Sequence, residues 1–318
     1  MEGKHIFKKT AVMMLAVFFV FAAAFASVQM PSYAASKPAK VTGIRAAARS
    51  NYSVRISWKK AKNAKKYQVY RANKKNGRYK KITTLAGTSY INSDLKKGTR
   101  YFYRVRAVNG NSKGVFSAKK SVSTMNSPLY DVEIDKAAGT VTISAKVNGK
   151  YFSRSTRHLM VDQYGFNKGT AMLTSYCIPD DLYNGLVRAG GVSWSKSAGK
   201  KLKNGEKNTV KNAEHKKFSR LDISIGWDGV SHSLDECLTT VKGGSSAPKI
   251  SMIFAGNPGA AAKTPSGCMV CMDSCYIGMA ANNAYGMCVI DKCKPCLYAR
   301  SDVLPADGTV VKVTFRVR

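Results

Sequence analysis

Residues 101–108 read Tyr-Phe-Tyr-Arg-Val-Arg-Ala-Val, with an apolar side chain at every second position. The same period of two recurs in Val54–Trp58 and in Tyr67–Tyr70, and Asn76-Gly77 supplies a hairpin turn after the second of these runs. Such alternation is typical of strands that bury one face. Since no helical pattern of useful length interrupts this part of the chain, we expect a small antiparallel β-sandwich, in a first domain at 35–125.

This segment resembles a fibronectin type III domain over its whole length. Trp58 stands where that family places a core tryptophan on its second strand, and Tyr67–Arg71 is similar to its third strand. Leu95–Tyr101 resembles the tyrosine corner of the family, in which the tyrosine hydroxyl bonds back to upstream backbone. The resemblance implies a spacer or binding module, with Trp58 and Tyr101 as core residues.

The charge of the chain is high and uneven. The 318 residues carry 52 Lys and Arg against 18 Asp and Glu, a net charge of +34. Lys37–Met125 holds 24 of the basic residues and a single acid, Asp94. Self-repulsion on this scale destabilises a small domain. We therefore expect an anionic partner, such as a cell-wall polymer or a membrane surface, with a solubilising surface as the alternative. No nucleic-acid motif is present, and we expect no specific nucleic-acid partner.

The first 34 residues are typical of an export signal. Three lysines precede the apolar stretch Ala11–Val28, and Ser32-Tyr33-Ala34 provides small residues before a cut after Ala34. An uncleaved membrane anchor is the alternative. We expect a secreted, extracellular protein, for which the cell wall is one place of attachment.

The second domain, 126–318, follows Asn126-Ser127-Pro128. Alternating residues predict two strands around the Ala138-Gly139 turn. Pro179-Asp180-Asp181 predicts the start of a helix that runs to Ala189 and ends at Gly190-Gly191. Further strands are expected at Ala171–Tyr176, Leu221–Ile225, Ile250–Ala255 and Val310–Val317. The predicted fold class is thus mainly β, a fibronectin type III β-sandwich followed by a mostly-β α+β cysteine-rich domain.

Several phrases of this domain are similar to the YdjY-type domain of exported bacterial proteins. They include Ile178–Tyr183, Gly226–Gly229 and, most specifically, Gly267–Cys275. The family is often described as ferredoxin-like because of its cysteine phrase, so the resemblance implies an iron–sulfur cluster. Ferredoxins use Cys-x2-Cys-x2-Cys-x3-Cys-Pro, whereas this chain has x2 then x3, and Tyr276 where a proline would follow.

Six of the eight cysteines lie between Cys268 and Cys296, and three interpretations of them compete. In a secreted protein they would pair as disulfides. The Cys-x2-Cys spacings of Cys268/Cys271 and Cys293/Cys296, with 21 residues between them, match a four-thiolate zinc site. Cys293-Lys294-Pro295-Cys296 is similar to a redox motif, without the usual strand-to-helix context. If a metal or cluster binds, the expected ligands are Cys268, Cys271, Cys275, Cys293 and Cys296, with Cys288 in reserve.

The sequence favours a protein that is not an enzyme. It contains no recognisable nucleophile elbow, zinc-protease helix or phosphate loop. We assign no catalytic residue: His158 and His232 are expected to be structural, and Asp180 and Asp181 to complement a helix N-terminus. The function we expect is surface association through the basic module. The alternatives are an extracytoplasmic metal-binding or electron-transfer protein and, less favoured, a wall-modifying hydrolase.

Overall fold

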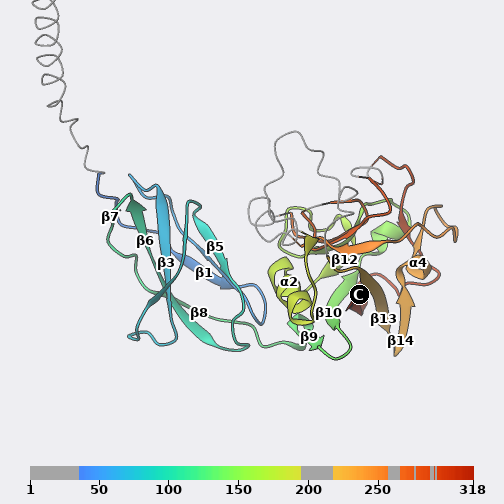
Figure 1. The fold of residues 1–318 in the computed structure, drawn as a ribbon, viewed down its shortest axis with the longest axis horizontal. Coiled ribbons are helices and arrows are strands. Elements are labelled where there is room, and N and C mark those ends of the chain that lie inside the picture. Colours follow the sequence, from blue (N-terminus) through green and yellow to red (C-terminus); the bar gives the residue numbers. More distant parts are fainter. Residues whose placement is uncertain (1–35, 195–217, 257–265, 276, 287–289, 291) are drawn as a thin grey trace, which may run out of the picture.

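The computed structural model describes residues 36–318 except 195–217, 257–265, 276, 287–289 and 291. The predicted export signal and Cys288 lie outside the described residues. The described chain forms two lobes, joined by the segment that follows strand β8 (Figure 1). Among the described residues, no helix has both the length and the apolar character needed to cross a membrane.

The first lobe is a β-sandwich of two antiparallel sheets. One sheet has the order β1-β2-β5, and the other has the order β4-β3-β6-β7, with β8 also paired to β6. The strands are β1 (Arg45–Ala48), β2 (Val54–Ser57), β3 (Lys66–Ala72), β4 (Lys80–Leu85), β5 (Ser89–Asn92), β6 (Arg100–Asn109), β7 (Ser112–Lys113) and β8 (Lys120–Ser123).

The predicted alternation sorts the side chains of the sandwich between core and surface. Tyr67 and Val69 on β3, and Tyr103 on β6, are buried between the sheets together with Trp58. The Tyr101 hydroxyl accepts a hydrogen bond from the Lys96 amide at 3.0 Å, which confirms the predicted tyrosine corner.

The second lobe is built on a mixed sheet with the order β14-β13-β20-β10-β12-β11-β17-β18-β16, and β9 also pairs with β10. The predicted turn at Gly139 and the predicted strands are confirmed. The sheet strands are β9 (Val132–Asp135), β10 (Thr140–Val147), β11 (His158–Asp162), β12 (Ala171–Ser175), β13 (Leu221–Trp227), β14 (Val230–Ser233), β16 (Met252–Phe254), β17 (Cys268–Cys271), β18 (Ala280–Asn282) and β20 (Val310–Val317). A separate pair comprises β15 (Leu238–Thr239) and β19 (Tyr298–Ala299).

The predicted helix is α2 (Pro179–Arg188), and it covers one face of this sheet. Leu182 and Leu186, four residues apart, are fully buried in the core of the lobe. At Gly185 a methyl group would lie 3.0 Å from side-chain carbons of both Val132 and Val141, so glycine allows the helix to lie close to β9 and β10. Other helical turns in the described part of the chain are α4 (Leu234–Cys237), η2 (Pro128–Tyr130) and η3 (Gly149–Phe152).

Polar contacts connect the two lobes at the loop between β1 and β2. Ser50 and Ser53 donate hydrogen bonds from this loop to the two carboxylate oxygens of Asp181, in the first turn of α2. Asn51 donates to Asp131 at 2.7 Å. Asp94 of the first lobe forms an ion pair with Arg188 at the end of α2. The first lobe therefore contacts both the first and the last turn of the helix.

Candidate functional site

Three of the predicted metal-ligating cysteines lie together, two in β17 and one just after it. Cys268 and Cys271 begin and end this strand, and Cys275 follows in the next turn. The Cys271 thiol is within hydrogen-bonding contact of both other thiols. The backbone of Gly278 lies beside them, because a methyl group there would be 3.5 Å from the Cys268 sulfur.

Two of these thiols, Cys271 and Cys275, are held in their protonated form. Hydrogen bonding to Cys268 and burial raise the pKa of Cys271 well above its ordinary value, although contact with Cys275 opposes the shift. The hydrogen bond to Cys271, followed by burial, raises the pKa of Cys275 as well. Because the thiolate is both the nucleophile and the metal-ligating form, Cys271 and Cys275 are unreactive as they are placed here.

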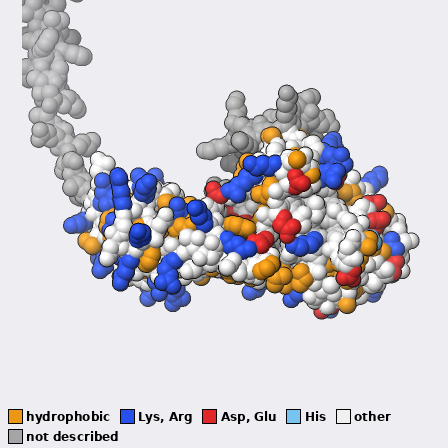
Figure 2. Space-filling model, turned by 90° about the horizontal axis from the view of Figure 1, so that it is seen from below, with side chains coloured by type: hydrophobic (Ala, Val, Ile, Leu, Met, Phe, Trp, Pro, Cys, Tyr) orange, Lys and Arg blue, Asp and Glu red, His pale blue; other side chains and the backbone are white. Residues whose placement is uncertain are grey.

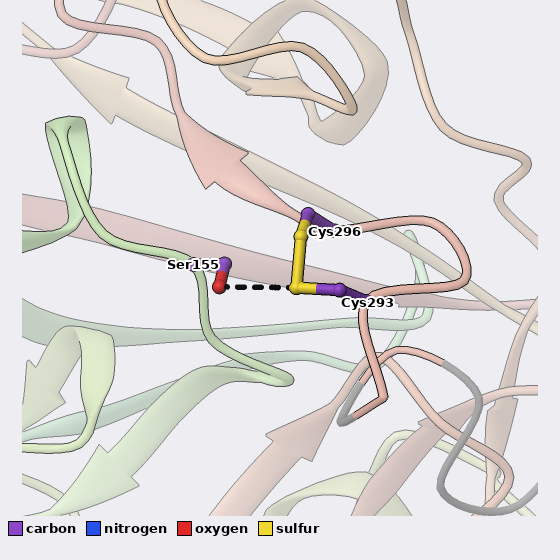
Figure 3. Close-up of a disulfide and its surroundings, with 3 residues drawn as sticks. All are labelled: Ser155, Cys293 and Cys296. Carbon is purple, nitrogen blue, oxygen red and sulfur yellow. Dashed lines mark hydrogen bonds between the residues drawn. A yellow bond between two sulfur atoms is a disulfide. The ribbon is translucent and has the colours of Figure 1, made fainter.

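The other two predicted ligands form a disulfide. Cys293 and Cys296 are bonded to each other, and the Ser155 hydroxyl lies 3.5 Å from the Cys293 sulfur (Figure 3). Sulfur atoms in a disulfide are not available as thiolate ligands. Among the described residues, no group of three or more His, Cys, Asp and Glu side chains is arranged to hold a metal ion. As arranged here, the cysteines that the structure describes do not fit a four-thiolate site, and the metal-ligand set stays a prediction.

The part of the cysteine segment that forms β17 is buried in the lobe, with Cys268 and Cys271 both inside. His158 on β11 stands opposite Cys271 in the sheet register and is buried, with its Nδ1 atom 2.9 Å from the Thr170 hydroxyl. Cys177 and Cys237 are also buried thiols. Burial raises the pKa of Cys237 to about 12.

The other histidine named from the sequence, His232, stacks on Trp227 with 4.3 Å between ring centroids.

A cavity of about 590 Å³ opens over strands β13, β14 and β20, a feature that the sequence did not indicate. Hydroxyl side chains from the three strands line it, including Ser224, Ser231 and Thr314. Arg318 and Asp222, also part of its lining, form an ion pair. This ion pair neutralises part of the charge in the lining of the cavity.

The basic surface of the first lobe is the second candidate site. Blue side chains spread over the visible face of this lobe, whereas red ones gather on the second lobe (Figure 2). On the outer face of the β4-β3-β6-β7 sheet, arginine and aromatic side chains stack on one another. Arg104 lies 3.9 Å above the Phe116 ring and 4.5 Å above the Tyr79 ring. Arg106 donates to Gln68 at 2.8 Å and to the Tyr70 hydroxyl at 2.7 Å.

Sequence reasoning found the charge of this surface but missed the stack. The period of two placed Arg104 and Arg106 on the outer face of their strand. The contact of both arginines with Phe116, which lies beyond β7, depends on how the chain returns to the sheet. A cluster of arginine and aromatic residues within strand patterns is the signal that could have found it.

The fold defines an all-β sandwich domain joined to a cysteine-containing mixed-sheet domain, and comparison with known proteins agrees. A model of the fibronectin type III domain matches residues 39–123, and a model of the YdjY domain matches residues 132–316. The chain belongs to the YdjY family, with a fibronectin type III domain in front of the family domain.

The chain is also similar to individual proteins. The "Uncharacterized protein YdjY" of Escherichia coli (strain K12) is 33% identical over 191 residues, which are 58% of this chain and 78% of that protein. An Fn3-like protein from Clostridium thermocellum is 33% identical over 27% of this chain and 92% of its own, with a TM-score of 0.26. The crystal structure of FN3tt is 25% identical over 28% of this chain and 97% of its own, also with a TM-score of 0.26.

Proposed function

We propose that this is an exported, non-catalytic, surface-associated protein. Its basic fibronectin type III domain binds anionic cell-surface polymers and holds the YdjY domain at that surface. The observation that carries the proposal is the charge of the first domain, where 24 basic residues accompany one acid.

The pairing of charges strengthens this proposal. The one acid, Asp94, is paired with Arg188 of the YdjY domain and not with a cation of its own domain. Among the described residues, Lys97 is the cation of the first domain that has a carboxylate partner, Asp131, and that partner also lies beyond the sandwich. The remaining cations repel one another, so a polyanion that reduces this repulsion gains binding energy.

Retention on an anionic polymer tests this function. The full mature chain would be applied to beads that carry poly(glycerol phosphate), and dextran beads would serve as the uncharged control. We expect retention at low salt and release at about 1 M NaCl, where the Debye length is only ~3 Å. Absence of retention at low salt, equal retention on dextran, or retention that salt does not change would contradict the proposal.

A further inference from the structure

A stack of cations and aromatic rings runs across the outer face of the β4-β3-β6-β7 sheet, and we call it the arginine ladder. Its members alternate in chemistry and come from several strands and loops of the first domain. They are Lys119, Tyr79, Arg104, Phe116, Tyr70, Arg106 and Gln68.

The register of two strands builds the centre of the ladder. In the antiparallel pair β3 and β6, Tyr70 stands directly opposite Arg104, and Gln68 stands directly opposite Arg106. Phe116 packs edge-on against Tyr70, with 5.0 Å between ring centroids and an angle of 89°. Both guanidinium groups contact this aromatic pair, Arg104 at 3.9 Å and Arg106 at 4.9 Å from the Phe116 centroid. Because the rings are packed together, they hold the planes of the two guanidinium groups.

The ladder presents hydrogen-bond donors to solvent. The Nε atom of Arg104 is buried and has no acceptor. The two Nη atoms of Arg104 also have no acceptor among the described residues, but they are not buried. Arg106 donates hydrogen bonds from Nε to Gln68 and from one Nη atom to the Tyr70 hydroxyl. Its other Nη atom makes no hydrogen bond among the described residues. Among the described residues, no carboxylate lies within ion-pair distance of either arginine.

We infer that the arginine ladder is a binding face for the phosphate groups of a linear polyol-phosphate polymer. This inference rests on the proposed function and locates it on one sheet. A guanidinium presents its donors in a planar fork that matches two oxygens of one phosphate, whereas an ammonium group acts as a point charge. Arg104 offers both of its Nη atoms and Arg106 offers its remaining one, at alternate positions of β6, and exposed Lys119 lies at one end. Such a row of donors matches a chain that carries one phosphate on each repeat.

The test separates the geometry of the ladder from its charge. The double variant R104K/R106K of the full chain keeps the net charge and removes the two planar guanidinium groups. The control variant K59Q/K60Q removes two charges at exposed positions just after β2, a strand of the opposite sheet, and leaves the ladder intact. Binding to poly(glycerol phosphate) and to polygalacturonate would be measured by titration at fixed salt, and thermal unfolding would show that each variant is folded.

We expect R104K/R106K to bind poly(glycerol phosphate) about tenfold more weakly, the loss that corresponds to ~1.4 kcal/mol, whereas K59Q/K60Q should stay within about twofold of the natural chain. The natural chain should prefer poly(glycerol phosphate) to polygalacturonate. If R104K/R106K does not fold, the single variant R106K replaces it, with a smaller expected loss in the same direction.

Two kinds of failure can be told apart. If the natural chain binds the polymer but R104K/R106K binds equally well, or if K59Q/K60Q loses as much, the ladder is not the binding face, while the proposed function stands. Equal binding of polygalacturonate overturns the assignment to phosphate. If the natural chain binds neither polymer at low salt, the proposed function fails as well.

Discussion

At the scale of single residues, two carboxylates at the contact between the lobes have opposite pKa shifts. Burial raises the pKa of Asp181 to about 6, although Ser50 and Ser53 donate hydrogen bonds to it. Burial also acts on Asp131, but hydrogen bonds from Lys97, Asn51 and Tyr52 outweigh it and hold the pKa of Asp131 below its ordinary value. The difference arises first because Asp181 is more deeply buried than Asp131. In addition, Asp131 has a cation beside it, whereas Asp180 and Asp94 repel a charge on Asp181.

Replacing Asp181 by asparagine should stabilise the protein at neutral pH. Since the folded-state pKa of about 6 lies above the ordinary 3.8, protonation of Asp181 contributes stability below about pH 4 that is lost as the pH rises through 6. The shift of about two units corresponds to an upper bound of ~3 kcal/mol. Urea unfolding of D181N at pH 4 and pH 7 should show a gain at pH 7 relative to the natural chain, and little gain at pH 4. The control is D228N, in an exposed turn. A D181N chain less stable than the natural one at pH 7 would contradict the assignment.

The Tyr101 hydroxyl should contribute measurably to the stability of the first domain. Y101F removes the acceptor of the Lys96 amide hydrogen bond and leaves the ring in the core, so we expect a loss of ~1 kcal/mol. The matched control is Y90F, because Tyr90 packs against the same core and its hydroxyl makes no hydrogen bond among the described residues. Urea unfolding at pH 7 measures both. An equal loss in the two variants would assign the effect to ring packing instead of the tyrosine corner.

At the scale of elements, local patterns predicted the strands and the helix, but they did not predict the contacts between distant segments. The alternation in β3 and β6 is a property of consecutive residues, and so are the proline and acids that start α2. Ser50 and Ser53 look like ordinary hairpin residues until α2 is placed against them. For the same reason, the cysteine spacing indicated a cluster but could not decide which sulfur atoms bond. In the structure Cys293 and Cys296 pair, and the cysteines of β17 do not.

The strand that carries Cys271 should protect its thiol from alkylation. Cys271 is buried and its pKa is raised by hydrogen bonding to Cys268 and by burial, so iodoacetamide at pH 8 should label it at least about tenfold more slowly in the native protein than in urea. Peptide mass spectrometry measures the two rates. Within the same sample, Cys293 and Cys296 should become labelled only after a reductant is added. Labelling of Cys271 at equal rates in both states would show that the strand does not bury it.

At the scale of the whole molecule, charge divides the chain as clearly as fold does. The first domain has one acid for 24 basic residues, and the contacts with the second lobe supply Asp131 as a carboxylate partner for Lys97. The YdjY domain carries many more acids, and three of its ion pairs, Lys312–Glu133, Arg300–Asp302 and Arg318–Asp222, are internal. Repulsion is therefore concentrated in one domain, and its consequences for stability should be confined there.

Added salt should stabilise the first domain more than the second. Raising NaCl from 0.05 M to 0.5 M shortens the Debye length, so it weakens repulsion between lysines and arginines on the sandwich surface. Each ~1 kcal/mol gained would raise the unfolding midpoint of a domain of this size by about 4–8 °C. Hydrogen exchange of backbone amides, measured over a series of temperatures, follows the stability of both domains in one chain. The amides of β6 report on the sandwich, and those of β10 report on the YdjY domain. Poly(glycerol phosphate) at low salt should protect β6 in the same way, because bound phosphates screen the same charges. Salt that protects β10 as much as β6, or that exposes β6, would show that charge repulsion does not limit the stability of the sandwich.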